Sequence, residues 1–212
     1  SYCVTALVAY DLLCAIENLK EEINKKTLDS WIKIVNPLIR FLIKFNETHA
    51  LISNHLATAV AALIRWDKLV GSEDANNKAE TLLNIILDNQ SSEGWYKEYE
   101  SADPGYQSLC TNYLADVYLN KPSNNLLVSL KKSLKFLKYF IHPDGSFGGI
   151  YGSRCTRFYY PGGLEALSKE IPDALLIAKE MQSSIENNRT VSLDSMDAVS
   201  YTHLRAHETR GN

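Results

Sequence analysis

The spacing of apolar residues predicts helices along almost the whole chain. Apolar positions recur every three or four residues over residues 2–23 and 28–45, whereas strand-type alternation is nearly absent. Turn residues and prolines separate the later segments. We expect these further helices to run from Asn54 to about Val70, from Asn76 or Asn77 to about Gln90, from Pro104–Gly105 to about Leu119, from Asn124 or Asn125 to before Pro143, and onward from Pro161 and from Pro172. The predicted fold class is therefore all-α.

Two local signals refine the boundaries of these helices. Pro37 lies inside the segment 28–45 and is expected to kink or split it, because proline lacks the amide hydrogen that a helix interior uses. Ser53 is a plausible N-cap for the helix that begins at Asn54. That helix is rich in alanine, so we expect neighbouring helices to approach it closely.

A weak internal repeat organises the helices. Two segments align at an offset of 51 residues, which places Gly94 opposite Gly145. Each copy ends a helix, turns at glycine, presents an aromatic residue and then reaches a Pro-Gly pair, at Pro104–Gly105 or Pro161–Gly162. A repeat of about fifty residues containing a helix pair indicates an α/α toroid, in which inner helices start at one common end. A helix bundle without repeats is the competing fold.

The end of the chain differs from the rest. Val199–Thr209 resembles a one-frame translation of a transposon adapter used in sequencing libraries. We therefore set residues 199–212 aside as a non-native tail and treat residues 1–198 as an α/α-toroid domain fragment from an assembled environmental sequence. On this interpretation the native chain continues past Ala198, and the tail is expected to make no contact with the core.

Charge and cysteine content narrow the partners. The net charge is −3, which does not favour a nucleic-acid partner, and no apolar run approaches the about 20 residues that span a bilayer, so we expect no membrane insertion. The four cysteines show no metal-type spacing, and free thiols favour a reducing, cytoplasmic compartment. We expect neither a metal nor a cofactor.

The first candidate site is Asn54–His55 at the start of a helix. Helix N-termini carry unpaired amide hydrogens and a partial positive charge, so they favour anions. An amide there can bind a substrate carboxylate, and a histidine can transfer a proton near neutral pH. The plain alternative is a capped helix followed by an ordinary polar histidine.

The second candidate site is the loop that follows the first repeat glycine, together with the next helix. Aromatic faces stack on sugar rings, and carboxylates accept hydrogen bonds from hydroxyl groups. The substrate-binding candidates in this loop are Trp95, Tyr96, Tyr99 and Asp103. Tyr106 and Tyr113 lie two helical turns apart on one face, with Tyr106 nearer the helix N-terminus. Packing in the core or at its rim is the alternative role for these aromatic residues.

The third candidate site is the glycine-rich stretch around residues 145–163. Arg154 and Arg157 can clamp a carboxylate or phosphate through paired hydrogen bonds, or can simply be solvated. No P-loop pattern is present, and His49, His55 and His142 lack the spacing of metal ligands.

With these residues in view, the chain resembles the toroid domains of the heparinase II/III and alginate-lyase group of polysaccharide lyases. The resemblance covers roughly residues 50–160 and rests on Asn54–His55, the Gly-aromatic loop and a downstream tyrosine, Tyr106 or Tyr113. It implies a carbohydrate-active enzyme that cleaves an acidic, uronate-containing polysaccharide by β-elimination. By the same implication, Asn54 neutralises the substrate carboxylate, and His55 and a tyrosine share the roles of base and acid.

Other functions stay open. Gln90, Gly94 and Trp95 also resemble the structural repeat signature of terpenoid cyclases, but the acidic runs of those enzymes are missing from the sequence. A non-catalytic glycan-binding or accessory toroid in polysaccharide synthesis or export is one alternative. A glycoside hydrolase is another, with candidate carboxylates at Glu98, Glu100, Asp103 and Asp144.

Overall fold

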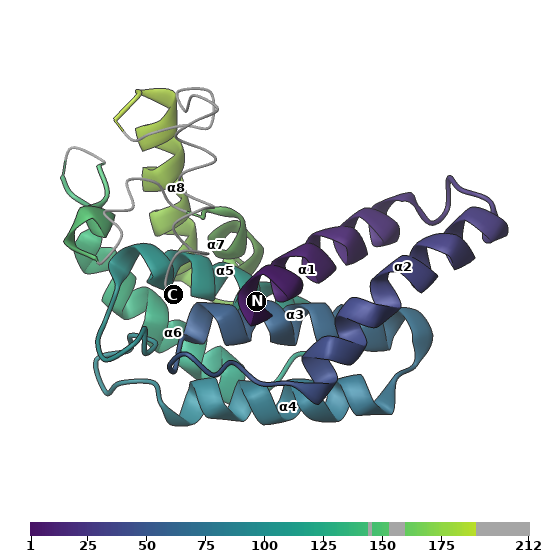
Figure 1. Ribbon diagram of the computed structural model, residues 1–212. Coiled ribbons are helices and arrows are strands. Elements are labelled where there is room, and N and C mark those ends of the chain that lie inside the picture. Colours follow the sequence, from purple (N-terminus) through teal and green to yellow (C-terminus); the bar gives the residue numbers. More distant parts are fainter. Residues whose placement is uncertain (144–145, 153–159, 190–212) are drawn as a thin grey trace.

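The computed structural model describes residues 1–143, 146–152 and 160–189, and that part of the chain is all-α, as predicted. It contains eight α-helices, two short 3₁₀ turns and no β-strand (Figure 1). The α-helices are α1 (Tyr2–Leu19), α2 (Lys25–Lys44), α3 (Ser53–Val70), α4 (Glu73–Asp88), α5 (Pro104–Asn120), α6 (Asn124–Leu137), α7 (Gly162–Leu167) and α8 (Pro172–Glu186). The proposed tail 199–212 lies outside the described residues.

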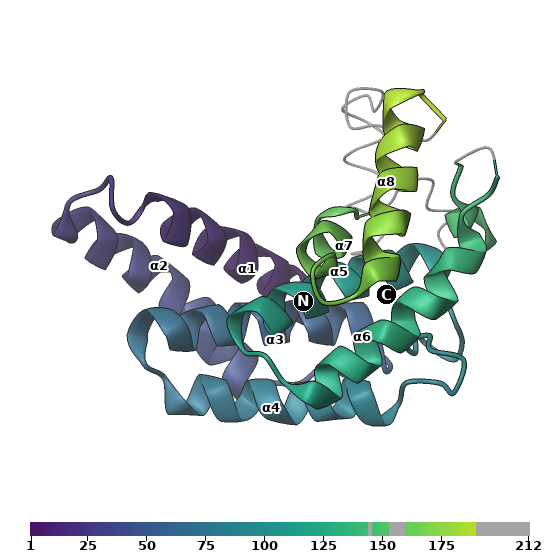
Figure 2. The same ribbon diagram turned by 180° about the vertical axis from the view of Figure 1, so that it is seen from behind.

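The helices alternate between two rows. In the first row, α1 packs on α3, α3 on α5 and α5 on α7. Each of these helices also packs on the helix that follows it, and α2 contacts α4 as α6 contacts α8. Figures 1 and 2 show the pair α1–α2 at one side of the molecule and α8 standing at the other, with α3 to α6 below them.

Helix α3 lies at the centre of the core because its side chains are small. Ala57, Ala59, Ala61 and Ala62 are at most 1% exposed, and α3 contacts α1, α2, α4 and α5. Side chains of one methyl group let neighbouring helices approach closely on every side of α3. The expectation from its alanine content is confirmed.

A partly buried ionic cluster shows that α1, α3 and α5 run in the same direction. Arg65 of α3 pairs with Glu17 of α1 and Asp116 of α5, with 2.9 Å between Arg65 Nε and Asp116 Oδ2. Lys68, one turn further along α3, donates to Glu17 at 2.8 Å and to Asn120 at 2.9 Å. All five residues lie near the C-terminal ends of their helices, so the three helices end together.

The predicted common start of the first-row helices holds for α3 and α5 but not for α7. The start of α3 and the loop that precedes α5 are hydrogen-bonded to each other, through Ser53 and Lys97. Helix α7 instead begins beside the middle of α5, where Gly163 N donates to Asn112 Oδ1 at 2.9 Å. A Cβ on Gly163 would lie 2.5 Å from Asn112 Cα, so the glycine permits this close crossing.

Several boundary predictions were wrong. Ser53 is not the N-cap of α3: Ile52 is, and the Ser53 hydroxyl donates to the carbonyl of Lys97 at 2.7 Å instead. A tertiary partner has therefore taken the hydroxyl that a cap would use.

Helix α4 begins earlier than expected, and α2 is not divided. Ser72 caps α4, so Asn76 and Asn77 lie inside the helix, because a serine just after the Gly71 stop offers the earlier cap. Ser123 likewise caps α6, directly before Asn124. Helix α2 continues through Pro37 as one helix, whose buried positions on both sides of the proline pack against its neighbours.

Helix α1 meets the length and composition of a membrane span, although no membrane insertion was expected from the sequence. It has 18 residues with a mean hydropathy of 1.4, and a third of them are buried. Core helices and signal sequences share these properties. In the structure α1 packs against α2 and α3, and its Glu17 belongs to the ionic cluster.

A tight turn after α4 depends on Gly94. Gln90 donates from Nε2 to the Gly94 carbonyl at 2.9 Å and to the Ser129 carbonyl of α6 at 3.0 Å. Gly94 has a φ of +103°, and a Cβ there would lie 2.2 Å from the carbonyl oxygen of Lys132. Gln90 and Gly94 therefore fasten the turn to α6.

A buried polar network continues from this turn into α5. Gln107 accepts from Tyr96 N at 2.8 Å and donates to Ser133 Oγ at 2.7 Å. The Tyr96 hydroxyl bonds Ser129 Oγ at 2.9 Å, and all four side chains are at most 5% exposed. Each of these buried groups has a partner, so the network joins the loop, α5 and α6 without an unpaired polar atom in these side chains.

We predict that Gly94→Ala lowers the free energy of unfolding by about 3 kcal/mol or more, because the added Cβ meets backbone that cannot move aside. Gly71→Ala is the matched control: Gly71 also has a positive φ, of +73°, but nothing lies within 4 Å of its Cβ position. That variant should lose only about 1 kcal/mol. Urea unfolding of both variants tests this prediction, and equal losses would contradict it.

Candidate functional site

The candidate site is the end of the molecule where α3 and α5 begin. The loop before α5 pairs in an antiparallel fashion with the segment before α3: Ser53 N donates to Lys97 O, and Tyr99 N to Leu51 O, both at 3.0 Å. Glu98 lies between these two hydrogen bonds and faces the start of α3. This pairing brings the first two sequence-predicted sites together.

Asn54 binds a carboxyl group, but that group belongs to the protein. Its backbone N donates to Glu98 Oε1 at 2.8 Å and its side-chain Nδ2 to Glu98 Oε2 at 2.7 Å. Both side chains are 3% exposed. Glu98 therefore satisfies the first-turn amide of α3 to which a substrate carboxylate was expected to bind.

Burial changes the protonation of Glu98. Loss of solvent, with a smaller contribution from the negative charge of Asp103, outweighs the two hydrogen bonds from Asn54 and raises the pKa of Glu98 to about 8. At neutral pH Glu98 is consequently a protonated carboxylic acid, held in place by Asn54.

His55 forms a pair with Glu47. The distance from His55 Nδ1 to Glu47 Oε2 is 2.9 Å, and the two side chains are 12% and 8% exposed. The hydrogen bond from His55 and those from the amides of His49 and Thr48 outweigh burial and lower the pKa of Glu47 to about 2. An ionised Glu47 fixes the proton of His55 on Nδ1, which leaves Nε2 of the neutral ring as a proton acceptor.

Tyr2 of α1 lies beside this pair. Its hydroxyl is buried without a hydrogen-bond partner among the described residues, and its ring packs 6.4 Å from that of Phe41. Burial and the charge of Glu47 both raise the pKa of Tyr2, so its hydroxyl stays protonated. The start of α1 thus meets the same end of the molecule as the start of α3.

The two candidate tyrosines of α5 lie in different surroundings. Tyr106 is half-buried in the first turn, where its N donates to Asp103 Oδ1 at 3.1 Å. Tyr113 is 7% exposed and packs edge-on against Tyr10 of α1, with ring centroids 5.0 Å apart. Tyr106 is therefore the tyrosine nearer the end at which His55 lies.

The candidate sugar-binding residues of the loop differ in how far their side chains are exposed to solvent. Tyr96 is fully buried in the polar network and presents no face to a ligand, and Asp103, 3% exposed, serves as the N-cap of α5. Trp95 is half-buried and donates to Glu93 at 3.0 Å. Tyr99 is 38% exposed, with a φ of +57° that is uncommon for a residue with a side chain.

Two further candidates, Arg154 and Arg157, lie outside the described residues. Within the described ranges, no group of three histidine, cysteine or acidic side chains is placed to hold a metal ion. Two hollows on the described surface lie away from His55: one between α1 and α3 at the ionic cluster, and one along α2 beside the start of α4.

Sequence reasoning missed Glu47 and Tyr2, and it weighed Glu98 only as a hydrolase carboxylate. Glu47 precedes His55 by eight residues, but the loop between them has no periodicity from which a contact could be read. Glu98 and Asn54 are 44 residues apart, and only the antiparallel pairing of two loops joins them.

The comparisons with known proteins found no similar protein. No protein-family model, no curated protein and no solved structure matches it. The residues and their geometry are therefore the basis of the functional argument.

We predict that Glu98→Gln flattens the pH dependence of stability. In the wild type, the folded state keeps the Glu98 proton up to about pH 8, whereas the unfolded chain releases it near the ordinary pKa of 4.5. The stabilising contribution is therefore complete below pH 4.5 and is lost as the pH rises toward 8, by on the order of a few kcal/mol.

Unfolding measured in denaturant at several pH values between 5 and 8 tests this prediction. Glu100→Gln is the control, because the Glu100 side chain is 92% exposed, and its profile should follow that of the wild type. A Glu98→Gln profile as steep as the wild-type profile would show that Glu98 is not held protonated.

Proposed function

We propose that this protein is a carbohydrate-active enzyme that acts on an acidic, uronate-containing polysaccharide by β-elimination. In this proposal its helices form part of an α/α toroid, and the substrate binds at the end where α1, α3 and α5 begin. The observation that carries the proposal is the His55–Glu47 pair at that end.

The toroid proposal is supported by the packing of the helices. The first row is parallel over α1, α3 and α5, each helix pairs with the one after it, and Arg65 and Asp116, which pair across α3 and α5, are 51 residues apart. That separation equals the offset of the sequence repeat. Parallel, equivalent helices in one row with returning helices in a second row are what a toroid requires.

The chemistry asks three things of the protein. The carboxylate of the sugar must be neutralised, the proton on the neighbouring C5 must be removed, and the leaving oxygen at C4 must receive a proton. In our proposal Nε2 of His55 removes the C5 proton, because Glu47 keeps the other ring nitrogen protonated and oriented. Tyr106, in the first turn of α5, is the candidate donor to the leaving oxygen.

Asn54 can bind a substrate carboxylate only where Glu98 has left it. The backbone and side-chain amides of Asn54 both donate hydrogen bonds to Glu98. Substrate binding through Asn54 therefore requires the loop 97–101 to move. The exchange is chemically matched, since one carboxyl group would replace another on the same two donors. In this step Glu98 serves as an internal stand-in for the substrate.

A glycoside hydrolase is the second candidate, and one observation favours it. Burial holds Glu98 protonated with the carboxyl group of Asp103 nearby, and acid-catalysed glycoside cleavage uses a protonated carboxyl group together with a second carboxyl group. Both side chains are 3% exposed, so this chemistry too needs the loop to open. Glu100 is almost fully exposed, and Asp144 lies outside the described residues.

We predict that the full-length native protein releases unsaturated uronates, detected by their ultraviolet absorbance, from at least one member of a panel of uronic-acid glycans. His55→Asn should lower kcat about 10²- to 10⁴-fold, because it removes the base. The amide of this variant can still donate to Glu47 from the place of Nδ1, so its unfolding midpoint should change little.

His55→Gln provides the complementary variant, since its amide reaches the position of Nε2 instead and gives up the contact with Glu47. It should lose both activity and stability. Cleavage by His55→Asn at the wild-type rate would remove His55 from the mechanism, and new reducing ends without unsaturated product would favour the hydrolase.

A further inference from the structure

The exposed face of α2 combines positive charge with apolar side chains. Helix α2 carries five basic residues and one acidic residue in a chain whose net charge is −3. Lys26, Lys33 and Arg40 recur every seven residues, and all three are exposed. At 1.5 Å per residue, these cations stand about 10 Å apart along one face of the helix.

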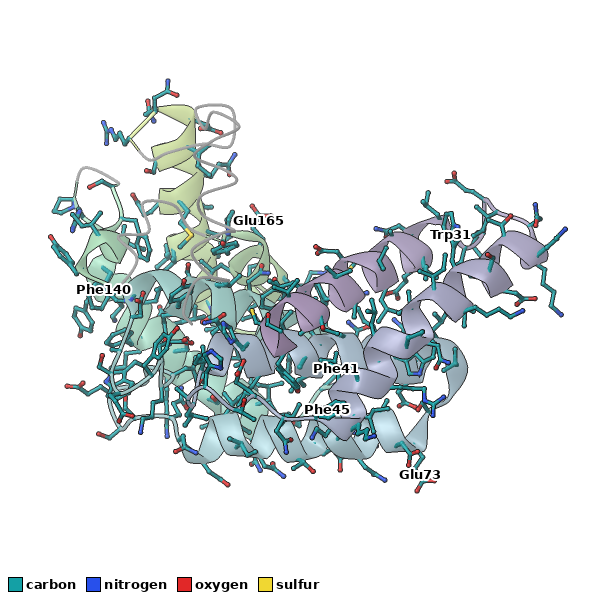
Figure 3. All side chains as sticks on the ribbon, in the orientation of Figure 1. Trp31, Phe41, Phe45, Glu73, Phe140 and Glu165 are labelled. Atoms are coloured by element: carbon teal, nitrogen blue, oxygen red, sulfur yellow. The ribbon has the colours of Figure 1, made fainter. Side chains whose placement is uncertain are left out.

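Exposed apolar side chains lie on the same helix and at its end. Ile34 is 60% exposed and Phe45 is 45% exposed, although large apolar residues are usually withdrawn from water. The Phe41 and Phe45 rings lie 4.8 Å apart, and the ammonium group of Lys44 lies 5.4 Å from the centre of the Phe45 ring. Figure 3 shows both rings where the end of α2 lies over α4, with Glu73 at the start of α4.

The same end of α2 is hollowed. A shallow groove runs beside α4 and is lined by Pro37, Arg40, Phe41, Ile43, Lys44, Phe45 and Asp74. Asp74 is its one acidic residue. Phe45, which lines the groove, precedes Glu47 by two residues in the sequence.

We propose that this face of α2, defined by Lys26, Lys33, Arg40, Lys44 and Phe45, binds an extended anionic polysaccharide outside the catalytic end. Regularly spaced cations complement the regularly spaced carboxylates of a polyuronate, and an exposed aromatic ring offers a stacking surface for a sugar. Charge complementarity favours this occupant over an apolar helix, which would leave the cations unpaired. The choice of a polyuronate rests on the proposed function, but the surface itself does not.

Binding of a long polyuronate, measured by isothermal titration calorimetry at low salt, tests the proposal. The triple variant Lys33→Gln, Arg40→Gln and Lys44→Gln should raise Kd about tenfold or more and reduce the dependence of binding on salt. The matched control removes three charges from another exposed helix face, with Lys131→Gln, Lys132→Gln and Lys135→Gln on α6, and should leave Kd within about twofold of the wild type.

Two single variants separate the groove from general attraction. Asp74→Asn should tighten binding, because it removes the one acidic group that lines the groove. Phe45→Ala should weaken binding without altering the salt dependence. Equal losses in the α2 and α6 triple variants, no saturable binding, or tighter binding to anionic vesicles or to duplex DNA would each overturn the proposal.

Cleavage of a short oligouronate keeps this proposal distinct from the proposed function. The α2 triple variant should cleave a short substrate at the wild-type rate and lose efficiency only on long chains. If binding is saturable and depends on α2 but the protein cleaves no glycan, the proposed binding surface is supported and the proposed enzymatic function is contradicted. Equal loss on short and long substrates would place α2 in the catalytic end and overturn a separate surface.

Discussion

The hydrogen bonds between Asn54 and the buried carboxyl of Glu98 hold the candidate site together. They join the start of α3 to the loop before α5 across 44 residues of sequence, and they satisfy an amide that the first turn of a helix leaves unpaired. Burial keeps Glu98 protonated at neutral pH, which avoids a second negative charge beside Asp103. This contact acts together with the backbone hydrogen bonds between Ser53 and Lys97 and between Tyr99 and Leu51, which join the same two segments.

The rest of the structure brings these residues within reach of one another. Gly94 and the glutamine network fix where the chain leaves α4, and the ionic cluster at Arg65 fixes how far α1, α3 and α5 extend at the opposite end. Because both ends are tied, the starts of α3 and α5 cannot shift past each other without breaking buried hydrogen bonds. The substrate-binding step proposed for Asn54 would have to break the hydrogen bonds that hold the loop 97–101, in which Tyr99 has a positive φ.

Periodicity revealed the helices and the common direction of α3 and α5, because apolar spacing and the Gly-Pro punctuation are local signals. It did not reveal the partners of the polar residues. Serine is a common helix N-cap, yet Ser53 donates to the carbonyl of Lys97. Asn54 was expected to bind a substrate carboxylate, yet it binds the carboxyl group of Glu98. Neither contact could be predicted, because each joins two loops whose sequences have no regular pattern. The exposed surface of α2 with its cations and Phe45 was not predicted either, because the sequence does not show which side of a helix is exposed.

The proposed β-elimination requires His55 to remove the proton next to a uronate carboxylate. Proton NMR of a uronate oligosaccharide, incubated with the full-length native protein in D₂O, follows that proton directly. If His55 is the base, the C5 proton signal at the cleavage site should disappear, and an alkene proton signal from the unsaturated product should replace it. New reducing ends in sugars that all retain their C5 protons would contradict the proposal, as would an oligosaccharide that stays intact across the whole panel.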